Sequence, residues 1–186
     1  PTSGEIRLNY GFCLFKNNHI KNAIREYRKA IALKPKLGLG YINLGIALSE
    51  LNNDKEAVNA FNKGLKYEPN HVGGLLGLAR SLRATDKHAA AVTYYKKALS
   101  LDKNLTNEYW ELGYSLCLAG DKIGGRTAYE TCLNHHPGHS IAVHLLNSLL
   151  GNASEAAPKE YITELWSVWK HRPRSFVRWL PALQGF

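Results

Sequence analysis

The sequence contains no methionine and begins at Pro1, so we expect it to be part of a longer translation product. No stretch approaches the roughly 18 uninterrupted apolar residues that span a bilayer. The first twenty residues also lack the charged start and apolar stretch of a secretory signal. These absences predict a soluble, cytoplasmic chain without a membrane span, whose leader or upstream domain, if it has one, lies outside this sequence.

Cysteine is scarce, and the three cysteines form no CxxC pair, which argues against a disulfide framework and a thiolate zinc site. We expect all three to be reduced and packed in the core: Cys13, Cys117 and Cys132. Three histidines flank a Pro-Gly turn with no carboxylate or cysteine nearby, and solvated turn positions are expected rather than a metal site: His135, His136 and His139.

Catalytic patterns are missing as well. No nucleophile, base and orienting residue form a recognisable set, and no glycine-rich phosphate loop follows a strand. The sequence therefore predicts no catalytic residues, no enzyme activity and no cofactor.

What the sequence does have is a 34-residue period. Four columns hold small or aromatic residues at this interval: Gly11, Gly45, Ala79 and Gly113; Ala23, Ala57, Ala91 and Gly125; Tyr27, Phe61, Tyr95 and Tyr129; and Ala30, Gly64, Ala98 and Cys132. Apolar residues within each unit follow three- and four-residue steps on both sides of a polar break such as Asn52-Asn53-Asp54. Each unit is therefore predicted to be a pair of helices whose small residues allow close approach.

These columns resemble the tetratricopeptide repeat. The second unit fits the repeat pattern at Tyr41, Leu44, Gly45, Leu48, Ala57, Phe61 and Pro69. The resemblance covers about residues 4–139, with departures at Ala79, Lys103, Gly125 and Cys132. It implies an all-α fold, a right-handed α-solenoid of about four helix pairs, with a concave groove lined by the first helix of each pair.

The predicted solenoid covers residues 1–150, with repeats at about 4–37, 38–71, 72–105 and 106–139 and the first helix of a partial fifth unit at 140–150. Residues 151–158 are expected to be a linker, and 159–186 a capping helix and a basic, Trp-rich tail. Helical spacing of Tyr161, Leu165, Val168 and Trp169 favours the cap. The alternative is that the tail is a docking element through Trp166, Trp169 and Trp179.

Polar side chains on the first helices are candidate ligand contacts. An Asn amide both donates and accepts hydrogen bonds, so a row of Asn residues can hold an extended peptide by its backbone. Tetratricopeptide proteins that bind extended peptides use Asn at the position of Asn9 and Asn43, so the resemblance implies two such contacts. The alternative is that both are ordinary solvated residues.

Apolar, aromatic and Arg side chains complete the predicted groove, because such residues often carry binding energy. The candidates are Phe12, Ile46, Arg80, Arg83, Trp110, Glu111 and Tyr114. Phe12 and Ile42 are as well explained by packing between first helices. The clamp by which some relatives hold a chaperone's C-terminal carboxylate is disfavoured, because only Asn43 fits it.

The net charge of +9 raises the hypothesis of nucleic-acid binding. Many of the cations fall on predicted second helices, such as Lys21, Arg25, Arg28 and Lys29, which places them on the solvated side and disfavours that hypothesis.

The function that explains most residues is a non-enzymatic module that binds an extended peptide or a partner helix in its groove. One alternative is a recruiting arm of a larger methyltransferase or glycosyltransferase. Residues 157–166 are similar to the junction between tetratricopeptide repeats and a methyltransferase domain in bacterial-type proteins. The other is a self-assembling scaffold, a homo-oligomer.

Overall fold

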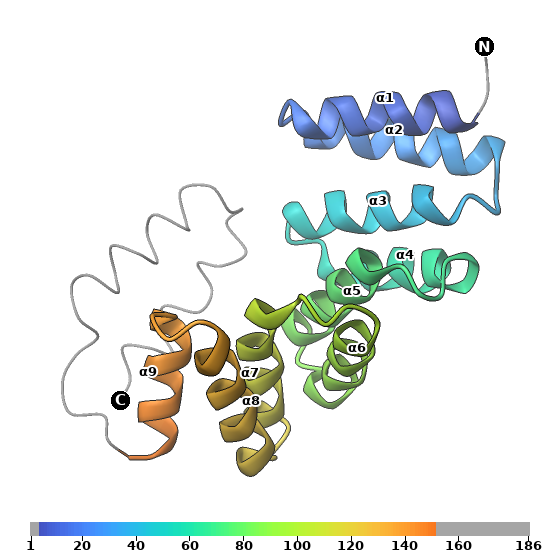
Figure 1. The fold of residues 1–186 in the computed structure, drawn as a ribbon. Coiled ribbons are helices and arrows are strands. Elements are labelled where there is room, and N and C mark those ends of the chain that lie inside the picture. The colour runs from blue at the N-terminus through green and yellow to red at the C-terminus, as the bar shows by residue number, and fades with distance from the viewer. Residues whose placement is uncertain (1–3, 152–186) are drawn as a thin grey trace. The chain divides into compact units, whose positions relative to one another are not determined.

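A computed structural model describes residues 4–151, and this part of the chain consists of helices joined by short turns (Figure 1). In order, these are α1 (Gly4–Lys16), α2 (Ile20–Leu33), α3 (Gly38–Glu50), α4 (Asp54–Tyr67), α5 (Val72–Ala84), α6 (His88–Leu101), a 3-10 turn η1 (Thr106–Glu108), α7 (Tyr109–Leu118), α8 (Lys122–His135) and α9 (Ser140–Leu149). The all-α repeat fold of the solenoid class is confirmed. None of the helices in 4–151 is long and apolar enough to cross a membrane.

The helix boundaries repeat with the period of the sequence. The first helices α1, α3 and α5 begin 34 residues apart, and so do the second helices α2, α4, α6 and α8. The exception is α7, which begins three residues late because its first turn is the 3-10 turn η1. α9 lies where the first helix of a fifth unit was predicted.

Each first helix ends in the same kind of turn. A residue with positive φ lies two positions beyond the ends of α1, α3, α5 and α7, and the second helix begins two positions later: Asn18, Asn52, Asp86 and Gly120. Asn, Asp and Gly tolerate the left-handed region better than other residues, which accounts for the polar breaks in the sequence. Gly151, with φ of 73°, takes the same place after α9.

The described residues belong to two compact units, and the boundary in the sequence falls inside the third predicted repeat, between Thr85 and Asp86. The first unit contains α1 to α5, and the second contains α6 to α9. Within the first unit, α3 packs against its own second helix α4 and also contacts α1, α2 and α5.

In the pairs α1–α2, α3–α4 and α7–α8 the core is an aromatic ring packed against a glycine. The rings of Tyr27, Phe61, Tyr95 and Tyr129 are at most 1% exposed. A Cβ atom added to Gly11 would lie 2.7 Å from Tyr27 Cε1, and one added to Gly113 would lie 2.7 Å from Tyr129 Cε1. Burial, with a smaller contribution from Cys13, raises the pKa of Tyr27 to about 12.

Phe61 is enclosed from two repeats. A Cβ added to Gly45, in the same repeat, would lie 2.9 Å from the ring at Cδ1. A Cβ added to Gly77, on α5 of the next repeat, would overlap the far end of the ring at Cζ. One side chain therefore joins α4 to both of the first helices beside it.

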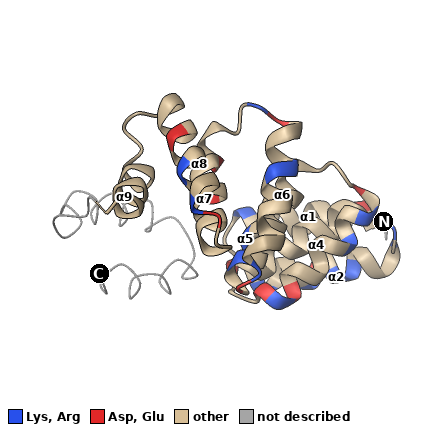
Figure 2. Ribbon diagram, turned by 90° about the horizontal axis from the view of Figure 1, so that it is seen from below, with Lys and Arg blue, Asp and Glu red and all other residues tan. Residues whose placement is uncertain are grey.

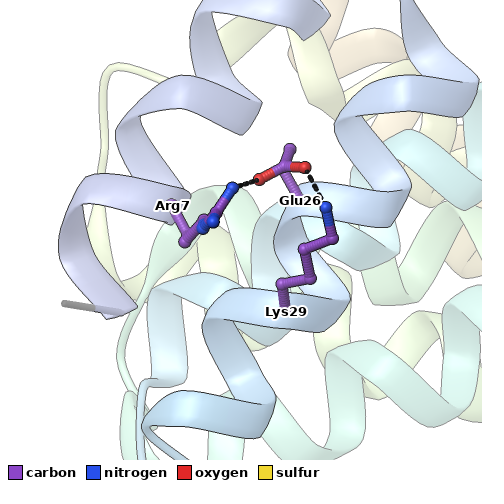
Figure 3. Close-up of polar contacts among 3 residues, drawn as sticks. All are labelled: Arg7, Glu26 and Lys29. Carbon is purple, nitrogen blue, oxygen red and sulfur yellow. Dashed lines mark hydrogen bonds and ion pairs between the residues drawn. The ribbon is translucent and has the colours of Figure 1, made fainter. Parts of the chain in front are cut away.

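The first repeat contains a buried carboxylate, that of Glu26 on α2. Glu26 Oε1 accepts a hydrogen bond from Lys29 Nζ at 2.8 Å, and Oε2 accepts one from Arg7 Nη1 at 2.9 Å (Figure 3). The hydrogen bond from Lys29, and then that from Arg7, hold the pKa of Glu26 below its usual range, against the raising effect of burial. Arg7 and Glu26 thus tie α1 to α2 by an ion pair.

The cysteines differ in part from the prediction. Cys132 is fully buried and Cys117 half-buried, and burial raises the pKa of both thiols. Cys13 is exposed on α1, so the expectation of core packing is wrong for this residue. The predicted capping helix and tail lie outside the described residues.

Replacing Gly77 by Ala tests the contact between repeats. We expect Gly77→Ala to lower the free energy of unfolding by about 1–3 kcal/mol, the usual cost of overpacking, because Phe61 has little room to move. The matched control is Gly73→Ala on the same helix, where the nearest atom to an added Cβ is 3.4 Å away. The control gains the helix propensity of Ala, about 1 kcal/mol, without the overlap. Urea unfolding of both variants gives the comparison, and equal stability would contradict the packing described.

Replacing Glu26 by Gln tests the buried ion pair. Near pH 7 we expect Glu26→Gln to unfold about 1–3 kcal/mol more easily, because charge-assisted hydrogen bonds are lost. The folded-state pKa of Glu26 is lowered, so its contribution is present above the unfolded pKa and disappears as pH falls through the folded one. The stability difference from the wild type should therefore shrink in acid.

The control is Glu56→Gln, which removes the exposed Arg28–Glu56 pair at 3.2 Å. Exposed pairs contribute about 0–1 kcal/mol, so this variant should stay close to the wild type. Thermal unfolding between pH 7 and pH 3 measures both variants. A Glu26→Gln deficit that persists unchanged in acid would show that the carboxylate charge is not its source.

Candidate functional site

The first helices of the first unit present a common face. Because α1, α3 and α5 recur at 34 residues, equivalent positions on them point in the same direction relative to their own repeats. We call this the first-helix face and define it by Asn9, Phe12, Asn43, Ile46 and Arg80, which come from α1, α3 and α5. α3 contacts both of its neighbours, so these positions follow one another across adjacent helices.

The two asparagines of this face differ in exposure. Asn9 is exposed and Asn43 is half-buried. Within residues 4–151 the structure gives neither side-chain amide a hydrogen-bond partner. Asn9 and Asn43 are 34 residues apart and form one column of equivalent positions. The third position of this column is Gly77, where a larger side chain would meet Phe61. The column therefore lies beside the packing between repeats, and a third Asn is excluded by packing.

A second column of equivalent positions, Phe12, Ile46 and Arg80, carries apolar and basic side chains. Phe12 is 47% exposed, and the Lys16 ammonium lies 5.4 Å from the centre of its ring. Sequence reasoning did not single out Lys16, although the four-residue spacing from Phe12 on one helix was the available signal. Ile46, Arg80 and Arg83 are half-buried. Ile42 is fully buried between α4 and the first helix α5, where a Cβ added to Gly74 would lie 3.2 Å from Ile42 Cδ1, so the packing alternative is right for this residue.

In the second unit the candidates lie on α7. Trp110 and Tyr114 are half-buried, and the Trp110 ring is 6.0 Å from the ring of His139 at the start of α9. Glu111 is only 2% exposed, which corrects the expectation that its side chain faces a ligand. Glu111 belongs to the same column as Gly77, the column that turns toward packing between repeats.

Two histidines accept hydrogen bonds at the starts of helices. His139 Nδ1 accepts a hydrogen bond from Ala142 N at 3.1 Å, and His71 Nδ1 accepts one from Gly74 N at 3.0 Å. These two side chains therefore cap the first turns of α9 and α5. His136 Nε2 pairs with Thr106 Oγ1 at 2.8 Å. No group of three or more His, Cys, Asp or Glu suited to a metal ion occurs within 4–151.

The basic residues predicted on the solvated side are exposed. Lys21, Arg25, Arg28 and Lys29 lie on the surface of α2, and Figure 2 shows further Lys and Arg positions on other helices. Two of these cations are paired, Arg28 with Glu56 and Lys29 with Glu26. The tail candidates Trp166, Trp169 and Trp179 lie outside the described residues.

The described helices recur as pairs at a 34-residue interval, and the first helix of each pair carries exposed side chains. These features define a helical repeat protein. Family models described as tetratricopeptide repeat match residues 4–37, 38–71 and 73–105, more than half of the chain. The chain belongs to the tetratricopeptide repeat family. No curated protein matches it.

Solved structures of tetratricopeptide proteins have a similar fold. A crystal structure of MamA protein is 19% identical with a TM-score of 0.72, covering 86% of each chain. A structure of MamA from Desulfovibrio magneticus RS-1, starting at residue 41, is 16% identical with a TM-score of 0.73, covering 90% of this chain and 95% of that one. YrrB, described as a TPR protein with an unusual peptide-binding site, is 21% identical with a TM-score of 0.74, covering 78% of this chain and 75% of its own. At these identities the likeness concerns the fold.

Proposed function

We propose that this chain is a non-enzymatic protein-interaction module that binds an extended peptide along the first-helix face. The observation that carries the proposal is the presence of two side-chain amides without partners in the described structure, on the consecutive first helices α1 and α3, beside an exposed aromatic ring. Amides that are not used within the fold are available to a ligand. The peptide-binding site named for YrrB supports the choice of ligand class.

The spacing of the helices suits an extended chain. Packed helix axes lie about 8–10 Å apart, and an extended peptide advances about 3.3 Å per residue. Asn9 and Asn43 would therefore contact peptide groups about three residues apart. Each amide can donate to a peptide carbonyl and accept from a peptide N–H, so this part of the recognition does not depend on the peptide's side chains.

Selectivity would come from the second column. The exposed ring of Phe12 offers an apolar contact, and Ile46 continues it on the next helix. Lys16 lies over that ring, and the chain carries a net charge of +9. We therefore expect preferred peptides to combine an apolar side chain with an adjacent carboxylate.

The first test replaces the amides. Peptides selected from a displayed random library on the full chain are measured by fluorescence polarisation against wild type and Asn9→Ala/Asn43→Ala. The Kd should rise about tenfold or more, because each lost hydrogen bond costs about 0.5–1.5 kcal/mol. The control is Asn22→Ala/Asn62→Ala, which changes two exposed asparagines on the second helices α2 and α4. An equal effect in both variants, or none in either, would refute binding through these amides.

The second test removes the apolar contacts. Phe12→Ala and Ile46→Ala should each weaken binding of the same peptides about fivefold or more, because truncation of anchoring side chains costs about 1 kcal/mol or more. Leu33→Ala is the control, since Leu33 is an equally exposed apolar residue on α2. Unchanged Kd values for Phe12→Ala and Ile46→Ala would place the ligand elsewhere.

A further inference from the structure

The last described helix is more apolar than its surroundings explain. α9 (SIAVHLLNSL) has six apolar residues among ten and no Asp, Glu, Lys or Arg, and its ribbon carries neither charge colour in Figure 2. The polar residues Ser140, His144, Asn147 and Ser148 lie on one side of the helix, and the apolar residues form a wide face on the other. A wide apolar face is normally buried against another element. Here only Ala142 is buried. The composition of α9 therefore calls for a covering element.

The two exposed large apolar residues at α9 lie on one stripe. Val143 is 38% exposed, Asn147 is exposed, and Leu150, at the end of the helix, is 43% exposed. Steps of four and three residues place them on one face. Their equivalents one and three repeats earlier include Gly113 and Gly45, and Leu116 and Leu48, all of which are buried. In those repeats the second helix of the same pair covers the stripe, as Gly45 and Gly113 against Phe61 and Tyr129 show.

The residue that follows α9 has the backbone conformation found before each second helix. Gly151 has φ of 73° and lies two residues after the end of α9. The same placement of a positive-φ residue follows α1, α3, α5 and α7, and in each case the chain reverses into a second helix. The end of α9 is thus built like the end of every earlier first helix.

Enough chain follows to supply the covering element. Residues 152–186 amount to 35 residues (186 − 151), whereas each second helix uses 14. Within them, KEYITELWSVWK (159–170) carries Tyr161, Leu165, Val168 and Trp169 at helical spacing. Its opposite side carries charged residues such as Glu160 and Glu164. This segment has one apolar face and one polar face, as an element on the outside of α9 requires.

We propose that residues 159–170 pack antiparallel on the Val143, Asn147 and Leu150 stripe of α9 and complete the fifth helix pair. The segment 152–158 then spans the distance from the Gly151 turn. The partner of this part of the Trp-rich tail is the chain's own α9, so Trp169 serves the repeat array and not an external protein. This inference is independent of what the first-helix face binds.

Hydrogen–deuterium exchange of the full chain, followed by mass spectrometry, tests the packing. Peptides covering 140–150 and 159–170 should both be protected, with exchange about tenfold or more slower than in Leu165→Lys, which places a charge in the proposed contact. Val143→Lys should remove protection from 159–170. Because Leu165→Lys leaves the repeats unaltered, it serves as the second variant if Val143→Lys unfolds the second unit, and protection of α8 reports that the unit remains folded.

The matched control is Ile123→Lys, which changes an 83% exposed apolar residue on α8 of the same unit and should leave both peptides protected. Residues 159–170 exchanging at the rate of an unstructured peptide in the wild type would overturn the proposal. Loss of protection at α1 instead of α9 in Leu165→Lys would also overturn it. So would protection that disappears on dilution together with a fall in mass, since a second copy would then be the covering partner.

Discussion

The contact between an aromatic ring and a residue without a side chain is the interaction on which the rest of the structure depends. The pairs α1–α2, α3–α4 and α7–α8 each close by placing a Tyr or Phe ring where the first helix carries Gly, and these rings are almost completely buried. A packed protein interior has few voids, so a ring of this size and an additional methyl group cannot occupy the same place. The small residues are therefore fixed by the large ones, which explains why both recur at one interval.

That constraint also decides which positions remain for binding. Phe61 reaches from its own pair to α5, and Gly77 must stay small to receive it. The positions of Asn9 and Asn43 therefore give way to packing at their equivalent on α5, Gly77. The equivalent position on α7, Glu111, is also buried. The neighbouring column of Phe12 and Ile46 is free of this constraint and keeps apolar side chains accessible.

The sequence predicts the architecture closely because packing at a fixed interval leaves a pattern in one dimension. The helix pairs, their 34-residue offset and the polar turns at Asn18 and Asn52 follow from residue types alone. Exposure of single residues was harder to predict. Cys13 was expected in the core because free cysteines are among the most often buried residues, yet it is exposed on α1. Glu111 was expected to face a ligand because it occupies the position of Asn9 and Asn43 on a later first helix, and the structure shows it buried.

The short range of the contacts in the first unit has a consequence for how the protein is made. The helices that α3 contacts most are α1, α2, α4 and α5. These partners lie within one repeat of α3 on either side in the sequence. Repeat arrays held together by neighbours can nucleate anywhere and propagate, and chains with local contacts fold fast. Synthesis proceeds at about 5–20 residues per second, so the first helix pairs can assemble while later repeats are still being translated.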